Sequence, residues 1–345
     1  MRQVEVYFCA MAAATTICLT QPANGDEKTE ANFYKGRNVY VFIGFGPGGG
    51  YDLSARALAR HMGRHISGEP TLIPRNMPGA GSMQLANYLY NVAPKDGSEF
   101  GTFARTIPLE PLIGKTSVNF DPRRFTWLGS SSNEVSTCVS WHTSSVATFE
   151  DLRKQELTVG ASGPASPSAS IPNVLNAVLG TRIKVITGYT GSATVLTAME
   201  SGEVSGFCSW GWMAIMAQRP GWVRDKKINV LVQLGLRKHL EHPEVPLATD
   251  FARSDEERKV LEFVFAPQMF ARPFAAPPNL SPERAATLRN AFAATLQDPI
   301  FIAEAEKLGL EPELVSWQDI QSLINSFFEA PPTVIAKVRD AMEAR

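Results

Sequence analysis

Phe45-Gly-Pro-Gly-Gly-Gly-Tyr-Asp52 joins an apolar, strand-like run at residues 39–43 to a helical pattern at residues 53–66. Glycine permits a sharp turn and lets a ligand approach the main chain closely. The first turn of the following helix carries unpaired N–H groups and the positive end of the helix dipole, so the corner can bind an anion without a basic side chain. Asp52 is expected to cap this helix by accepting a hydrogen bond from the amide near Ala55.

A second glycine-rich corner, Asn76-Met-Pro-Gly-Ala-Gly-Ser82, follows a strand candidate at 70–73 and precedes a helical pattern at 83–92. Corners that follow adjacent parallel strands lie at one sheet edge, so these two can face one ligand from two sides. The first corner also matches G-x-G-x-x-G from Gly44. The second strand ends without the acidic residue of a dinucleotide site, so we favour a small anion over a nucleotide.

Strand-like and helical segments alternate along the rest of the chain, which indicates an α/β fold with parallel sheets covered by helices. Ser281 is expected to cap a helix that has Pro282 at its first position. The length of 345 residues corresponds to roughly two domains, and no linker separates them, so we expect the chain to cross between them repeatedly. Strand candidates are 99–104, 157–160, 184–187, 204–207 and 228–234; helix candidates are 171–179, 192–199 and most of 281–345.

The composition is that of a folded protein with a large core: 44% hydrophobic residues and a net charge of -1, from 33 basic and 34 acidic side chains. A disordered chain would need low hydrophobicity and high net charge. Binding of nucleic acid through bulk positive charge is excluded as well. No stretch reaches the roughly 20 apolar residues of a membrane-spanning helix.

The N-terminus predicts export. Residues 6–19 are almost wholly apolar or small, and Ala23 and Gly25 suit cleavage after residue 25. We therefore expect a signal peptide at 1–25 and a periplasmic protein; the alternative is a buried N-terminal helix. Cleavage removes Cys9 and Cys18 and leaves two cysteines, Cys138 and Cys208, which either pair in an oxidising compartment or remain free thiols.

Together with Ala93-Pro-Lys-Asp-Gly97, the two corners resemble the Bug-type receptors, the extracytoplasmic solute-binding proteins of tripartite tricarboxylate transporters. The resemblance covers about residues 36 to 340. It implies a type II periplasmic-binding-protein fold with a ligand cleft at the hinge between two lobes. Lobe 1 would comprise 26–131 and 236–345, and lobe 2 would comprise 132–235. Further matching segments are Val159-Gly-Ala-Ser-Gly163, Tyr189-Thr-Gly-Ser192, Gly202-Glu-Val204, Asp298-Pro299 and Leu308-Gly-Leu-Glu-Pro312.

The resemblance also implies a ligand and partners: a small carboxylate (a di- or tricarboxylate or an aromatic acid) and the membrane permease subunits of the transporter. No nucleic acid, cofactor or metal is expected, and the receptor is expected to be a monomer. Backbone amides and bridging waters of lobe 1 would hold the carboxylate, with opposing contacts from lobe 2. The implied residues are Gly48, Gly49, Gly50, Tyr51, Asp52, Gly79, Ala80, Gly81 and Ser82 in lobe 1, and Ser162, Ser166, Tyr189, Thr190, Gly191 and Ser192 in lobe 2.

The sequence departs from the family pattern at two places. Tyr51 stands where Thr or Ser is common, and it could stack on a ligand or narrow the pocket. Cys208-Ser-Trp-Gly-Trp212 replaces a segment that commonly carries an Asp, so Ser209 and Trp210 become candidate contacts; the indoles belong either to the site or to the core. Arg105, after a strand of lobe 1, either grips a carboxylate bidentately or lies solvated on the surface.

Nothing in the sequence forms a catalytic constellation. The five histidines form no H-E-x-x-H motif, and G-x-S-x-G is absent. His61 and His65 could share a metal, but no third ligand is evident, so a polar helix face is expected. We therefore expect a binding protein and no enzyme. The alternatives are an exported carboxylate-sensing receptor on the same scaffold and, less favoured, an acyl-transfer, cofactor- or nucleotide-dependent enzyme, which turnover of a ligand would reveal.

Overall fold

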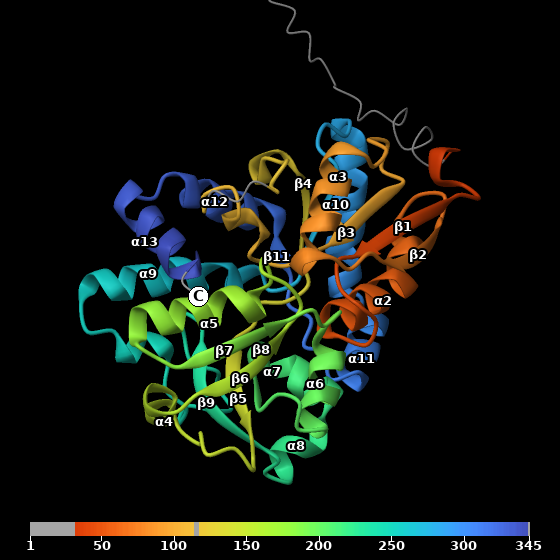
Figure 1. The fold of residues 1–345 in the computed structure, drawn as a ribbon. Helices are drawn as coiled ribbons and strands as arrows, with labels where there is room; N and C mark the ends of the chain where they lie inside the picture. The colour runs from red at the N-terminus through yellow and green to blue at the C-terminus, as the bar shows by residue number, and fades with distance from the viewer. Residues whose placement is uncertain (1–31, 114–116, 344–345) are drawn as a thin grey trace, which may run out of the picture.

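The computed structural model describes residues 32–113 and 117–343, which form two lobes, each built around its own sheet (Figure 1). The expected signal peptide at 1–25, with Cys9 and Cys18, lies outside the described residues. Within the described ranges, no helix has the length and apolar character needed to cross a bilayer.

The first lobe contains a mixed six-stranded sheet. Its inner strand β1 is apolar throughout its second half because both of its faces are covered: Val41 and Ile43 are completely buried. The neighbours β2 and β3 run parallel to β1, whereas β10 runs antiparallel to β3 because the chain returns from the other lobe at this point. In spatial order the strands are β11 (Val315–Ser316), β4 (Thr126–Ser130), β10 (Pro273–Ala276), β3 (Glu99–Thr102), β1 (Asn38–Ile43) and β2 (Thr71–Asn76).

The second lobe contains a mixed five-stranded sheet. Strands β7 and β8 run parallel to β6, and β5 runs antiparallel to both β8 and β9. In spatial order the strands are β7 (Ile183–Thr187), β6 (Leu157–Ala161), β8 (Gly206–Gly211), β5 (Ser136–Trp141) and β9 (Ile228–Leu234).

Two segments cross between the lobes and pair with each other. The first leads from β4 to β5 through residues 131–135, and the second returns to β10 through residues 268–272. Their backbones are joined by hydrogen bonds from Ser131 N to Arg272 O (3.1 Å), from Ala271 N to Ser132 O (3.0 Å) and from Glu134 N to Gln268 O (3.3 Å). These paired segments form the hinge.

Helices cover both sheets. Ser281 caps α10 by accepting a hydrogen bond from Arg284 N (3.2 Å), and Pro282 begins the helix, as the sequence predicts. The α-helices are α2 (Gly50–Met62), α3 (Met83–Asn91), α4 (Phe149–Lys154), α5 (Pro167–Leu179), α6 (Ser192–Glu200), α7 (Trp212–Gln218), α8 (Pro220–Arg224), α9 (Asp255–Phe265), α10 (Pro282–Gln297), α11 (Pro299–Lys307), α12 (Trp317–Phe328) and α13 (Pro332–Glu343). The 3-10 helices are η1 (Gly63–His65), η2 (Ala80–Ser82), η3 (Ile107–Leu109), η4 (Pro122–Arg124), η5 (Ala248–Phe251) and η6 (Ala266–Phe270).

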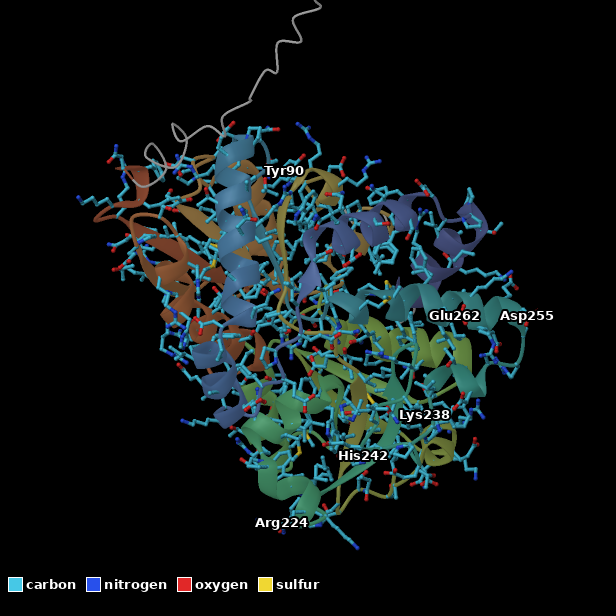
Figure 2. The ribbon with its side chains drawn as sticks, turned by 180° about the vertical axis from the view of Figure 1, so that it is seen from behind. Tyr90, Arg224, Lys238, His242, Asp255 and Glu262 are labelled. Carbon is cyan, nitrogen blue, oxygen red and sulfur yellow. A yellow bond between two sulfur atoms is a disulfide. The ribbon has the colours of Figure 1, made fainter. Side chains whose placement is uncertain are left out.

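The C-terminal third does not pack as one body with the first lobe. Helix α9, marked by Asp255 and Glu262 in Figure 2, lies against α5 of the second lobe, and α13 packs on both. Asn173 of α5 donates a hydrogen bond to Met342 O of α13 (3.2 Å). The family resemblance implies that 236–345 belongs to the first lobe, whereas α9 and α13 pack against α5 of the second. Helices α10, α11 and α12 remain with the first lobe, against α2 and β4.

Most expected elements are present, and the structure adds strands β4, β5, β10 and β11 and helices α4, α7, α8 and α9. The expectation of parallel sheets is wrong at the strands that flank the hinge crossings, since β10 runs antiparallel to β3 and β4, and β5 runs antiparallel to β8 and β9. Strand direction at these positions depends on the hinge crossing, which local sequence patterns do not encode.

Candidate functional site

A cavity lies between the lobes, where the carboxyl ends of strands from both sheets meet. The cavity has a volume of about 60 Å³, so the site suits a small ligand. The lining residues are Phe45, Gly49, Gly50, Tyr51, Arg105, Ser162, Ser166, Pro167, Ser168, Gly191, Ser192, Val195, Phe207, Ser209, Trp210, Gly211, Ala214 and Arg272.

Several helices begin at the wall of this cavity. Helix α2 starts at Gly50 and contributes Gly49, Gly50 and Tyr51 to the wall; α5 and α6 contribute their own first residues from the other lobe. The N-terminus of a helix presents unpaired N–H groups and a partial positive charge. The arrangement therefore favours a bound anion contacted from both lobes, and it agrees with the rule that α/β sheets bind ligands beyond the carboxyl ends of their strands.

Arg105 reaches from the first lobe into this cavity. It is 2% exposed, so the surface alternative is wrong. Its Nη2 donates hydrogen bonds to Ser136 Oγ (2.8 Å) and to Ser209 Oγ (2.6 Å), both in the second lobe. Burial lowers the pKa of the Arg105 guanidinium, the nearby Tyr51 and Glu134 raise it, and Arg272 lowers it. Arginine nevertheless remains charged in proteins.

Among the described residues, no carboxylate forms an ion pair with Arg105. A buried guanidinium that has only neutral hydroxyl partners is costly, because taking a charge out of water needs an opposite charge in compensation. Arg105 is therefore the strongest anion-binding group in the cavity.

Arg272 is a second cationic group in the wall, and sequence reasoning missed it. It lies on the returning hinge segment and is 7% exposed. Its Nη1 forms an ion pair with Glu134 Oε2 (2.7 Å). In the sequence, Arg272 stands within the apolar run 269–276 and near no glycine corner, so only the presence of a charge in an apolar run could have indicated a site residue. Its place in the site depends on the pairing of two segments more than 130 residues apart.

Aromatic side chains form the apolar part of the wall. Tyr51 stacks on Phe45 with ring centroids 4.5 Å apart, and the Arg272 guanidinium lies 4.6 Å above the Tyr51 ring. Trp210 lies in the core and also lines the cavity, so both alternatives for this indole hold: it contacts Phe207 and Trp222 and is 2% exposed. Its Nε1 is buried without a hydrogen-bond partner in the described part of the chain.

Asp52 does not cap α2, contrary to the sequence expectation. The cap residue is Gly49, no side chain caps the helix, and Asp52 lies inside the first turn. Its buried carboxylate instead accepts hydrogen bonds from Gly48 N (2.9 Å), Arg56 Nε (2.9 Å) and Asn76 Nδ2 (2.8 Å). Asp52 thus ties the first glycine corner to the second, and the ligand-facing atoms of α2 belong to its neighbours.

The second glycine corner contacts the other lobe and does not line this cavity. A Cβ atom on Gly81 would collide with the backbone of Ser166 and come within 2.8 Å of Ala165 C. Ser82, which is buried, accepts a hydrogen bond from Ala104 N (2.7 Å), so it supports the segment that carries Arg105. Gly79 and Ala80 belong to the same corner, outside the lining residues.

The remaining lobe 2 candidates divide between the cavity and the interface of the lobes. Ser162, Ser166, Gly191, Ser192 and Ser209 line the cavity. Thr190 O accepts a hydrogen bond from Gly46 N of the first lobe (2.8 Å). Tyr189 points elsewhere: its hydroxyl donates to Glu203 (2.5 Å), and burial together with this contact raises the pKa of Tyr189 to about 12.

Further bonds hold the lobes together in this conformation. Thr106 Oγ1 donates to Ala165 O (3.1 Å), and Gln218 Nε2 donates to Gly48 O (3.2 Å). The structure therefore shows the lobes in contact on both sides of the cavity.

Cys138 and Cys208 are paired as a disulfide directly behind the site. They lie opposite one another on β5 and β8, with their Cα atoms 3.9 Å apart. The residue after Cys208 is Ser209, whose φ of +60° is uncommon for a residue other than glycine. The disulfide thus anchors the strand that presents Ser209 to Arg105.

The histidines of α2 and η1 do not face the cavity. His61 Nε2 contacts Glu304 (2.5 Å) and His65 Nε2 contacts Asp298 (2.9 Å), and Arg60 and Arg64 contact the same carboxylates. In residues 32–113 and 117–343, no three side chains of the metal-binding types come together. This cluster instead joins α2 to the start and middle of α11.

No family model matches the sequence, and no curated protein is significantly similar to it. Solved structures match over most of the chain. The periplasmic binding protein BugD is 18% identical, with a TM-score of 0.72 over 89% of this chain and 98% of its own. MatC from Rhodopseudomonas palustris, solved with bound malate, is 18% identical, with a TM-score of 0.69 over 89% of this chain and 99% of its own. Another R. palustris protein, solved with adipate, is 18% identical, with a TM-score of 0.68 over 88% of this chain and 97% of its own.

These likenesses confirm the predicted two-lobed α/β fold, which is the fold of the Bug-type periplasmic binding proteins. Of these neighbours, BugD is a periplasmic binding protein, and the other two were solved with a small carboxylate bound.

Proposed function

We propose that this chain is an extracytoplasmic solute-binding protein of the Bug type. It captures a small carboxylate between its lobes and delivers it to the membrane subunits of a tripartite tricarboxylate transporter. The observation that carries the proposal is the buried guanidinium of Arg105 in the interlobe cavity, which has hydroxyl partners and no carboxylate among the described residues. The ligands of the structural neighbours, malate and adipate, belong to the same chemical class.

Capture follows from the placement of donors on both lobes. The N-terminus of α2 and the Arg105 side chain belong to the first lobe, whereas α5, α6 and Ser209 belong to the second. A carboxylate in the cavity would thus accept hydrogen bonds from both, and a charge-assisted hydrogen bond contributes roughly 1.5–3 kcal/mol. Closure of the lobes removes water and strengthens each interaction.

A thermal-shift screen tests the carboxylate class. The chain without residues 1–25 is heated alone and with mono-, di- and tricarboxylates, aromatic acids and neutral analogues of the same size. A ligand at 100 times its dissociation constant stabilises the folded state by about 2.7 kcal/mol. We expect a carboxylate to raise the melting temperature. A neutral compound that raises it while no carboxylate does would contradict the assignment.

Delivery to a transporter is tested separately. Uptake of the bound carboxylate into vesicles that contain the transporter's membrane subunits should require this protein in its liganded form. If uptake proceeds at the same rate without this protein, it does not deliver the ligand, and a carboxylate-sensing receptor with the same fold becomes the better interpretation. Export is tested by finding the chain in the periplasm with an N-terminus at residue 26.

A further inference from the structure

The charges around the cavity do not balance. Two arginines, Arg105 and Arg272, stand among the lining residues, and no acidic residue does. Arg105 is hydrogen-bonded to Ser136 and Ser209, both neutral. Arg272 is paired with Glu134. The two guanidiniums of the wall and the Glu134 carboxylate, which also favours the charged form of Arg105, therefore carry one net positive charge together.

Glu134 lies outside the wall and is fixed in place. It belongs to the first hinge segment, where its amide donates to Gln268 O (3.3 Å). Its side chain packs directly against Gly211, because a Cβ atom on that glycine would collide with the carboxylate. The Glu134 side chain is 2% exposed, and apart from the ion pair with Arg272 its carboxylate oxygens have no hydrogen-bond partner among the described residues.

The Glu134 carboxylate is compensated by Arg272, whose Nη1 forms the ion pair. Breaking a buried ion pair leaves an uncompensated charge and is strongly unfavourable. A second ligand carboxylate at Arg272 would therefore share a guanidinium whose charge Glu134 already balances. The same ligand would also place its second negative charge close to a buried negative charge.

The rest of the wall suits an apolar ligand body. The cavity is also lined by Phe45, Tyr51, Val195, Phe207 and Trp210, and none of its lining residues other than the two arginines is charged. Apolar surface buried against these side chains contributes about 25 cal/mol per Å². A second carboxylate turned toward this surface would lose its hydration without gaining a partner.

We propose that Glu134, by balancing the charge of Arg272, leaves one positive charge in the site for a ligand to balance. The site is therefore selective for ligands with a single carboxylate on an apolar body. The inference rests on the proposed function and deepens it by stating the charge of the ligand. Glu134 is a positioning residue, since it acts through Arg272 and does not line the cavity itself.

Isothermal titration calorimetry with two matched ligand pairs tests the inference. The pairs are hexanoate with adipate and benzoate with terephthalate, which differ by one carboxylate within each pair. We expect the wild-type protein to bind hexanoate or benzoate more tightly than its diacid partner, by at least about tenfold. Equal or tighter binding of the diacids would overturn the inference and leave the carboxylate-binding function standing. If no acid of either kind binds, the proposed function itself fails.

Two variants separate charge from shape. Glu134→Gln frees Arg272, so we expect the dissociation-constant ratio to shift toward the diacids by at least about tenfold. The double variant with Glu134→Gln and Arg272→Gln removes both charges without leaving either buried partner alone, and the preference for monoacids should return. Glu313→Gln, which removes an exposed carboxylate near the hinge, is the matched control.

A ratio that stays unchanged in a folded Glu134→Gln protein, as judged by circular dichroism, would contradict the proposal. If that variant does not fold, the dissociation-constant ratios of the wild type and of the double variant still test the proposal. A double variant that prefers diacids would contradict the proposal equally. A merely structural role of Glu134 would weaken all four acids together and would not move the ratio.

Discussion

At the scale of single residues, burial decides the role of each charged side chain. The sequence left Arg105 open between a carboxylate contact and a surface position, because an arginine after a strand is compatible with both. The fold places the carboxyl end of β3 against the other lobe, and Arg105 becomes buried between Ser136 and Ser209. Arg272 and Glu134 could not be predicted, since their meeting depends on the pairing of two distant hinge segments.

Ser209 gives a prediction at this scale. Its hydroxyl accepts a hydrogen bond from Arg105 Nη2 across the interface of the lobes. Ser209→Ala should weaken carboxylate binding by up to about tenfold, because one net hydrogen bond contributes roughly 0.5–1.5 kcal/mol. Calorimetric titration of the variant provides the measurement. Ser205→Ala, just before the same strand, is the control; equal effects of the two substitutions would argue against the role of Ser209.

At the scale of elements, the sequence predicts the two glycine corners and most helices correctly, because turn chemistry and helix periodicity are local. The assignment of Asp52 as a cap failed because the glycine run lets α2 begin three residues earlier, at Gly50, and the carboxylate then lies within the first turn. The Gly81 corner was expected to hold a carboxylate; in the structure it lies against Ser166 of the other lobe instead of the cavity.

Gly81 and Gly180 form a matched pair, since both have φ of +70°. A Cβ atom on Gly180 would meet nothing within 4 Å, whereas one on Gly81 would strike the backbone of the opposite lobe. Both Gly81→Ala and Gly180→Ala should lower thermal stability, because alanine is strained at this φ. Gly81→Ala alone should also weaken ligand binding, by roughly 5- to 150-fold for an overpacking cost of about 1–3 kcal/mol. Calorimetry that finds equal affinities for the two variants would contradict the closed arrangement.

The cluster between α2 and α11 predicts a pH dependence of stability. Hydrogen bonds from Arg64, Ile300 N and His65 lower the pKa of Asp298 from 3.8 to about 2. Because the folded pKa lies below the ordinary one, the carboxylate stabilises the fold fully above about pH 4. This contribution is lost as the pH falls from about 4 to about 2.

Chemical denaturation of the wild type and of Asp298→Asn at pH 7, 5, 4 and 3 measures this contribution. The variant should be less stable than the wild type at pH 7, and the difference should shrink below about pH 4. Asp340→Asn, on the exposed side of α13, serves as the control. A difference that grows on acidification would show that Asp298 does not stabilise the fold as an anion.

At the scale of the whole molecule, the sequence and the structure agree on two lobes with a cleft at the hinge. They differ in how the C-terminal part is shared, because α9 and α13 bury their apolar faces on α5 of the second lobe. Hydrophobic periodicity in the sequence shows that a helix has an apolar face, but it does not show which distant surface covers that face. The hinge crossings also bring Arg105, Arg272 and Glu134 to one place, so the character of the site is a property of the complete fold.

The central claim is that Arg105 binds a carboxylate between the lobes. Calorimetric titration of the wild type and of Arg105→Gln with the carboxylate that raises the melting temperature most tests it directly. Arg75→Gln is the control, since Arg75 is exposed and its guanidinium stacks on Tyr40. We predict one ligand per chain for the wild type and the control. Arg105→Gln should bind roughly 10- to 100-fold more weakly, the equivalent of one charge-assisted contact. Unchanged affinity in a folded Arg105→Gln protein would contradict the account.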